Sequence, residues 1–385
     1  MTSSSRFFVS SKVLVGFLNA LFGGISTAFL LSKGFSILSI SAVFSVSLVT
    51  STLLEIPSGF IADRIGRKRT YALGILFRGL QAFLFWTATH NAALYVAAFS
   101  EGLYSALTSG SLEAWMKGTG ESIDYPQVFG LSKMLSSLVS TVSLFAIGLV
   151  FAFQLSDLFM TITVLYCIVA FACLTLLKDN TGNEGTANNS ALLRSLLHQY
   201  ITDKQMLFLT YVLSSTFAFI SVYMLYFQPR ALQLGFAESA LPLLSSISLM
   251  GNALSGYLYS RYGKRFGNNA FVLLSFIGIT LSFVGFATAP SSTILLLSNY
   301  LYGVSMGGLI PIFFSWSLDV LAEDNIATNL SIMSGIATFI AALTTLLVGF
   351  AVDLLGLNSA IVIGIFLCMS CMGILWVLQR SNLSA

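Results

Sequence analysis

Long apolar runs follow one another along nearly the whole chain, and this pattern limits the fold more than any other feature. Of the 385 residues, 56% are apolar and only 9% are charged, whereas soluble domains contain about 25% charged residues. A helix needs about 20 apolar residues to cross a bilayer core, and the runs far exceed the roughly 10 residues of a barrel strand. The sequence therefore predicts an all-α integral membrane protein.

Twelve runs are bounded by charged residues, Gly, Pro or Asn. They lie at about 12–32, 36–60, 70–88, 91–116, 128–153 and 157–177, then at 206–228, 238–260, 270–289, 292–318, 328–350 and 358–378. Residues 179–190 are rich in Asn, Gly and Thr, which is typical of a flexible linker, and the leucines of 191–200 favour a short surface helix. We expect one six-helix bundle at 1–177, a cytoplasmic linker at 178–205, and a second bundle at 206–385. Two such similar blocks indicate an internal duplication.

Composition also excludes several classes of function. Soluble enzymes, nucleic-acid binders and secreted disulfide scaffolds need polar surface that this chain lacks, and a net charge of +3 is too small to indicate a polyanionic partner. All four cysteines lie in apolar runs and are interpreted as core residues. His90 and His198 lie in connections, where they cannot build a metal centre alone. We expect no metal and no cofactor.

The distribution of Lys and Arg predicts the orientation. With the N-terminus inside, every Lys and Arg except Lys33, Arg78 and Arg230 lies in or beside an internal segment. By the positive-inside rule, both termini are expected in the cytoplasm and the chain in the cytoplasmic (inner) membrane. The first apolar run is interpreted as a retained span rather than a signal peptide, because no small-residue cleavage site follows it.

A charged, glycine-containing loop follows the second run. Its residues are Gly59, Asp63, Arg64, Gly66, Arg67 and Lys68, in the order G-x-x-x-D-R-x-G-R-K. A degraded copy follows the eighth run, with Gly256, Ser260, Arg261, Gly263 and Lys264. This loop resembles the signature loop of the major facilitator superfamily, and the six-plus-six arrangement extends the resemblance over the whole chain.

The resemblance implies a transporter whose two bundles rock about a central site, exposing it to each side in turn. Its partners are then a small-molecule substrate, a proton or other coupling ion, and the lipid bilayer, with a single chain sufficient as a monomer. In this family the loop latches the two bundles together at the cytoplasmic face. Gly66 suits the tight turn, and Asp63 suits a basic side chain or a helix N-terminus. We add Glu55 and Glu113 to the candidate latch.

Two charges fall near the middle of consecutive predicted spans. Arg78 lies about eight residues into the third span from the cytoplasm, and Glu101 about ten into the fourth from outside, so at 1.5 Å per residue their depths match. Charges within a bilayer are costly and often functional. We expect Arg78 and Glu101 to form an ion pair. Glu101 is expected to bind and release a proton as its contacts with Arg78 and with the substrate form and break. A static structural pair remains the alternative.

The remaining polar candidates for the substrate cavity are Asn19, Gln81, Tyr223, Tyr226, Asn252 and Asn299. Pro229 at the end of the seventh span predicts a broken or kinked helix. The glycines of 303–311 in the tenth span predict close helix packing and a hinge.

We expect proton-coupled export of a small amphipathic or organic compound, with metabolite uptake or facilitated diffusion as the alternative. The chain departs from the family's drug antiporters, since its fifth span lacks their Gly-Pro pair and Ala98 stands where they usually carry Arg. A membrane-embedded enzyme or a non-transporting sensor is less consistent with the sequence, because both histidines lie outside the spans and no added soluble domain fits.

Overall fold

The computed structural model describes residues 3–109, 111–117, 125–150, 155–176, 203–320 and 326–383, and this part of the chain is almost entirely helical. Contacts divide the chain into two compact units, one comprising 1–185 with 236–246 and the other 186–235 with 247–385. The predicted surface helix at 191–200 and most of the predicted linker lie outside the described residues. The predicted bundle boundaries stay a prediction.

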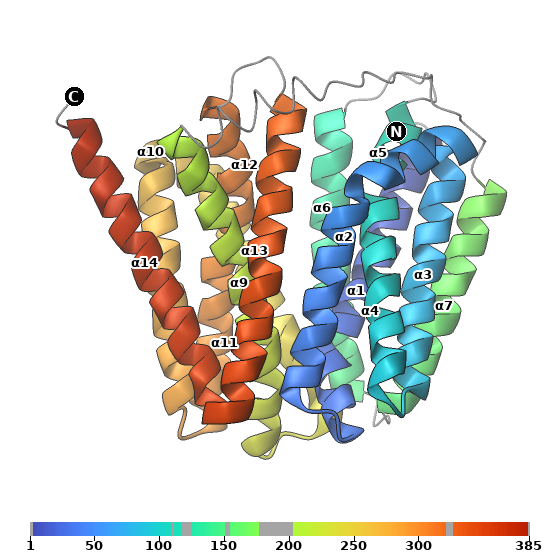
Figure 1. Cartoon of the computed structure of the whole chain (residues 1–385), viewed down its shortest axis with the longest axis horizontal. Helices are drawn as coiled ribbons and strands as arrows, with labels where there is room; N and C mark the ends of the chain where they lie inside the picture. The colour runs from blue at the N-terminus through green and yellow to red at the C-terminus, as the bar shows by residue number, and fades with distance from the viewer. Residues whose placement is uncertain are drawn as a thin grey trace. The chain divides into compact units, whose positions relative to one another are not determined.

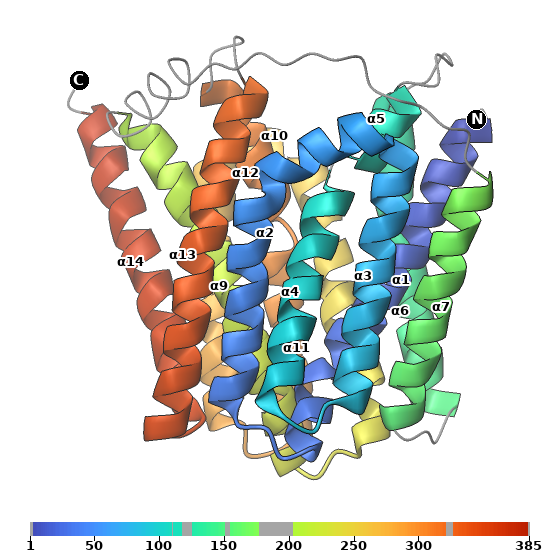
Figure 2. The same cartoon turned by 45° about the vertical axis from the view of Figure 1, so that its right-hand side comes forward.

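The first half contains six spans (Figure 1). They are α1 (Ser3–Ser32), α2 (Ile37–Ile65), α3 (Arg67–Thr87), α4 (Asn91–Thr108) continued by the short α5 (Ser111–Lys117), α6 (Tyr125–Val150) and α7 (Leu155–Leu176). Helix α1 contacts α5, α6 and α7, while α4 packs against both α2 and α3 (Figure 2). Helix α3 also lies along α7. The helices that carry residues 78 and 101 are therefore neighbours, and the helix that carries residue 19 belongs to the same unit.

The second half repeats this order. It contains α9 (Lys204–Gln233), the short η1 (Glu238–Ala240), α10 (Leu241–Thr288), α11 (Ser292–Met306) followed by α12 (Leu309–Val320), α13 (Ile326–Leu355) and α14 (Asn358–Leu383). Helix α10 comprises two spans, because Gly267 has a non-helical backbone (φ 76°, ψ 159°). Counting α4 with α5 and α11 with α12, the described residues form the twelve predicted spans. Seven helical segments of this part are long and apolar enough to cross a membrane by themselves.

Of the broken or kinked helix predicted at Pro229, the break is wrong, because α9 continues through this residue to Gln233. Proline lacks a backbone N–H and therefore removes one intrahelical hydrogen bond. Only four helical residues follow Pro229, so the loss falls near the end of the helix, where it does not interrupt the span.

The duplication has a constant spacing in the structure. Gly34 and Gly235, with φ of 86° and 85°, are 201 residues apart, and so are Gly66 and Gly267, with φ of 97° and 76°. Each glycine adopts a positive φ that other residues rarely tolerate. The first residues of α4 and α11, Asn91 and Ser292, have the same separation.

This spacing corrects the pairing of the two charged loops. The sequence motif paired Gly66 with Gly263, but helical backbone continues past Gly263 and the turn occurs at Gly267. The sequence motif aligned the two loops by residue identity. In the structure, this alignment is wrong by one helical turn. The structural counterpart of Asp63 is consequently Lys264 rather than Ser260, so the second loop reverses the charge.

Glycines bring two pairs of helices into backbone contact at equivalent places. A Cβ on Gly102 of α4 would lie 2.9 Å from the carbonyl oxygen of Ser47 in α2, and one on Gly303 of α11 would collide with the carbonyl of Ser248 in α10. Each pair is related by the 201-residue spacing. Gly307 likewise abuts the backbone of Asn252. The close packing predicted for 303–311 is confirmed, and the helix is interrupted at Gly307–Gly308 between α11 and α12.

Replacing Gly303 with Ala is expected to lower stability by about 1–3 kcal/mol, because the new methyl group meets backbone atoms that cannot rotate away. The matched control is Gly373→Ala in α14, where a Cβ meets nothing within 4 Å and better helix propensity contributes up to about 1 kcal/mol. Thermal unfolding of the purified variants in detergent measures the difference. Equal melting temperatures would contradict the backbone contact.

Candidate functional site

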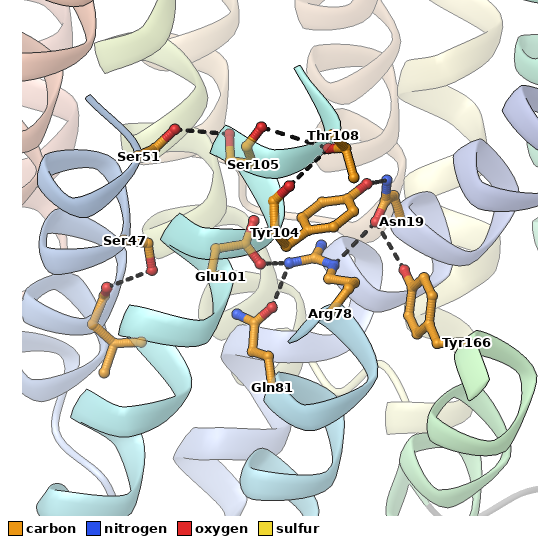
Figure 3. Close-up of polar contacts among 11 residues, drawn as sticks. Asn19, Ser47, Ser51, Arg78, Gln81, Glu101, Tyr104, Ser105, Thr108 and Tyr166 are labelled. Atoms are coloured by element: carbon orange, nitrogen blue, oxygen red, sulfur yellow. Dashed lines mark hydrogen bonds and ion pairs between the residues drawn. The ribbon is translucent and has the colours of Figure 1, made fainter. Parts of the chain in front are cut away.

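Arg78 lies at the centre of a polar cluster in the first half (Figure 3). Its guanidinium carbon is 4.3 Å from the ring centroid of Phe22 and 5.2 Å from that of Tyr104. Such contacts of a cation with aromatic faces are attractive, most strongly where water is excluded. The guanidinium plane is therefore flanked by rings from α1 and α4.

Three oxygen acceptors from different side chains surround the same guanidinium. Its Nε donates to Asn19 Oδ1 at 3.0 Å, and its Nη1 donates to Gln81 Oε1 and forms an ion pair with Glu101 Oε2. The structure thus brings together four residues predicted from the sequence, Asn19, Arg78, Gln81 and Glu101. Charge-assisted hydrogen bonds of this kind are about twice as strong as neutral ones.

Asn19 connects the cluster to two tyrosines that the sequence did not single out. Its Oδ1 also accepts a hydrogen bond from the Tyr166 hydroxyl at 2.8 Å, and its Nδ2 donates to the Tyr104 hydroxyl at 2.7 Å. One amide from α1 therefore bridges α3, α4 and α7. Neither tyrosine lies in a recognisable motif. The only sequence signal for Tyr104 is its position one helical turn beyond Glu101.

The two charged partners differ in how firmly they are held. The Arg78 side chain is 9% exposed and that of Glu101 is 24% exposed. Arg78 has acceptors on three helices and two rings against it, whereas Arg78 is the only side-chain partner of Glu101 among the described residues. Arg78 is therefore held by more contacts than Glu101.

The equivalent region of the second half is aromatic. The Tyr223 hydroxyl donates to Asn299 Oδ1 at 2.9 Å, and its ring stacks on Tyr302 with centroids 4.4 Å apart and planes at 7°. On its own helix, Phe227 stacks on Tyr223 at 5.0 Å. Tyr302 donates its hydroxyl proton to the Phe219 carbonyl. Two of the predicted cavity residues, Tyr223 and Asn299, are therefore in contact.

The other two cavity candidates of this half lie apart from that stack. The Tyr226 side chain is fully buried. Its hydroxyl donates to Asn358 Oδ1 at 2.9 Å and lies 3.2 Å from the Phe286 carbonyl, and these hydrogen bonds join α9 to α14 and α10. Asn252 lies on α10, and its buried Oδ1 has no hydrogen-bond partner within the described ranges. Tyr226 is held by its helix contacts, while Asn252 keeps an unused acceptor.

The 201-residue spacing shows how the two halves differ chemically. Phe22, Arg78 and Glu101 correspond to Tyr223, Ile279 and Tyr302. Ala98 corresponds to Asn299. The same backbone positions that hold an ion pair in one half hold stacked rings in the other.

The cytoplasmic loop after α2 is built on Gly66, which ends that helix and precedes α3. Arg64 is exposed, and Glu55, Arg67 and Lys68 are half-buried. The side chains of three further latch candidates, Asp63, Glu113 and Lys264, lie outside the described residues. In the second half, the Tyr259 hydroxyl donates to Asn268 Oδ1 at 2.9 Å across the turn at Gly267. Arg261 is exposed and lies over the Tyr262 ring.

At the opposite ends of the helices, two basic residues cap the carboxyl ends of spans. Lys33 donates to the carbonyl of Trp86 in the last turn of α3 and to that of Ala88 directly after this helix. Arg230 donates to the carbonyl of Ala289 after α10. Cations are favoured at helix carboxyl ends. Burial lowers the pKa of Lys33. Ala88 and Ala289 are again 201 residues apart, so the cap is a repeated feature.

No group of three or more His, Cys, Asp or Glu side chains suited to a metal ion occurs within the described residues. The Arg78 cluster combines a guanidinium, a carboxyl group and two amides, which are groups that hydrogen-bond polar molecules.

We expect Asn19→Leu and Tyr166→Phe to be coupled, because Asn19 Oδ1 accepts the Tyr166 proton. Asn19→Leu should cost about 1–3 kcal/mol, since it leaves buried donors unsatisfied, and the double variant should be at least about 0.5 kcal/mol less destabilised than the sum. Thermal or denaturant unfolding in detergent measures this cycle. The control combines Asn19→Leu with Tyr226→Phe in the other half, and these effects should add. Additive behaviour of the Asn19–Tyr166 pair would refute the bond.

Comparisons with known proteins give one consistent family. A model described as Major Facilitator Superfamily matches residues 9–333. An uncharacterized MFS-type transporter, YxaM of Bacillus subtilis (strain 168), is 23% identical over 288 residues, 72% of each chain.

Solved structures share the fold at low sequence identity. The nucleoside transporter NupG has a TM-score of 0.78 at 14% identity, covering 98% of this chain and 99% of that one. A bacterial homolog to the human lysosomal transporter Spinster, inward-facing and unoccupied, has a TM-score of 0.77 at 11% identity, covering 100% and 98%. A POT family transporter in complex with a thioalcohol conjugated peptide has a TM-score of 0.71 at 12% identity, covering 99% and 96%.

Proposed function

Because the chain belongs to the major facilitator superfamily of transporters, we propose that it moves a small organic solute across the cytoplasmic membrane by alternating access, coupled to protons through Glu101. The observation that supports this proposal is the Arg78–Glu101 ion pair inside spanning helices. Ionisable groups at such positions are costly and often belong to ion or solute pathways. Membership of a transporter family favours transport over catalysis or sensing.

Two sets of side chains are proposed to contact the solute. Asn19 and Gln81 supply amide groups beside Arg78 in the first half, and in the second half Tyr223 and Asn299 supply a hydrogen-bonded pair within an aromatic stack. Aromatic faces bury large area, and their polar edges fix orientation. A solute with a charged or strongly polar group and an apolar remainder fits this chemistry.

We assign the cytoplasmic loop after α2 to a latch that favours one conformation of the transport cycle. The assignment rests on the charged motif from Gly59 to Lys68, on the turn at Gly66 and on the acids Glu55 and Glu113. The second loop, at Gly256, Arg261, Gly263 and Lys264, carries basic charge at the position equivalent to Asp63. We further propose that both termini are cytoplasmic and that one chain suffices for transport.

The direction of transport depends on how proton and solute share the site. Export, expected from the sequence, requires the proton and the solute to bind in turn, whereas uptake by symport requires them to bind together. The ion pair is compatible with either order until the solute's charge is specified. Facilitated diffusion remains the alternative in which Glu101 has only a structural role.

Glu101→Gln is expected to abolish solute movement driven by a pH gradient while exchange without a gradient continues, because the amide keeps the shape of the side chain but exchanges no proton. A growth and accumulation screen of overexpressing cells first supplies a transported solute. Its flux is then measured in right-side-out and inside-out vesicles with an imposed pH gradient. Glu238→Gln, the same change at an exposed acid, is the control and should behave as the wild type. An unchanged response to the gradient in Glu101→Gln would remove Glu101 from the coupling mechanism.

A further inference from the structure

The Arg78–Glu101 pair is asymmetric, and the asymmetry indicates which partner a solute replaces. Arg78 is held by Asn19 from α1 and Gln81 from its own helix, between the rings of Phe22 and Tyr104. Glu101 is held by Arg78 alone among the described residues, and more of its side chain is exposed. Displacing Glu101 requires the loss of one ion pair, whereas displacing Arg78 requires the loss of the whole cluster.

The ion pair uses only part of each charged group. Arg78 Nε donates to Asn19, and Nη1 donates to Gln81 and faces Glu101. Glu101 uses only Oε2 in the ion pair. A guanidinium beside a carboxylate that it contacts through one oxygen is suited to bind another planar anion.

We propose that the transported solute is a small organic carboxylate, whose oxygens take the place of the Glu101 carboxylate on Arg78. This inference rests on the proposed function and specifies its substrate class. A solute cation would need Glu101 as its partner and would lie within a few ångströms of the fixed Arg78 charge, which repels it. A neutral solute would have to displace an ion pair without replacing its charge.

The same exchange of carboxylates accounts for the coupling to a proton. When the solute carboxylate occupies Arg78, Glu101 is left as an unpaired carboxylate in a spanning helix, where the neutral form is favoured. Glu101 therefore takes one proton from the aqueous phase, and the net charge of the site is unchanged. One proton moves with one anion in an electroneutral step. This is the order of a symporter, which favours the uptake alternative over the export expected from the sequence.

Glu101 has few ionisable neighbours. The titratable or charged groups that face the cluster are Arg78 from α3, Tyr104 from α4 and, through Asn19, Tyr166 from α7. Helix α2 presents hydroxyl groups to α4, with Ser51 bonded to Ser105 and Thr50 against Gly102. Among the described side chains that face this cluster, Glu101 is the carboxyl group available to take the proton.

The test uses the full-length protein in detergent and three matched sets of probes: acetate, benzoate and cyclohexanecarboxylate, the corresponding amides, and the corresponding amines. Thermal unfolding at pH 5.5 and pH 8 reports binding. At least one carboxylate is expected to raise the melting temperature, with at least tenfold tighter binding at pH 5.5, while its amide and amine do not. A pH electrode in weakly buffered solution should record proton uptake on binding.

Variants separate the two charges. In Glu101→Gln, carboxylate binding should become independent of pH, because no proton is needed to free Arg78. In the double variant Arg78→Met with Glu101→Gln, which removes both charges together and avoids a lone buried carboxylate, the carboxylate shift should disappear. Glu238→Gln should match the wild type throughout.

Several results would overturn the assignment of a carboxylate solute. They are stabilisation by an amine in preference to its carboxylate, no stabilisation by any of the three carboxylates, and carboxylate binding that survives loss of Arg78. Carboxylate binding without proton uptake would instead contradict the proton coupling of the proposed function and leave the substrate class standing. Vesicle transport that depends on the pH gradient, together with no carboxylate binding, would contradict only the substrate class.

Discussion

A positive charge buried in a membrane-spanning helix is the constraint on which the first half of this protein depends. Burying an ion is favourable only when partners replace the water it loses. Arg78 receives those partners from α1, α3 and α4, and Asn19 extends the network to α7. The same interactions that make the charge tolerable also fix its position. A fixed cation with one replaceable anion is a binding site for another anion.

The duplicated backbone shows how one scaffold accommodates two chemistries. Positive-φ glycines, helix starts and carboxyl-end caps recur every 201 residues. At the centre, however, Glu101 is matched by Tyr302 and Arg78 by Ile279, which is fully buried. Tyr302 therefore needs no ionic partner and stacks on Tyr223 instead. Turns and close contacts depend on backbone geometry and are retained, whereas the central side chains differ between the two halves.

Much of the fold was predictable from the sequence because the bilayer imposes a simple rule on span length. The twelve spans, the close packing at Gly303 and the contact of Arg78 with Glu101 all follow from apolar runs, small residues and depth. The register of the second loop was mispredicted, because this segment contains several glycines that could form the turn. Only the backbone geometry identifies Gly267 as the turn residue. Tyr104 and Tyr166 were missed because a tyrosine in an apolar helix has no pattern that separates a buried hydrogen bond from an interfacial position. Pro229 was misread because its effect depends on its distance from the helix end.

The close helix contacts determine which motions the candidate site allows. Gly102 follows Glu101 directly and lies against the backbone of α2, and Gly303 follows Tyr302 in the same way against α10. Helices packed backbone to backbone resist sliding, because interiors at native density have no room for shifted side chains. On the proposed function, we therefore expect Glu101 to leave Arg78 by rotation of its own side chain rather than by displacement of α4 from α2. Exchange of one carboxylate for another would then leave the backbone contact between these two helices intact.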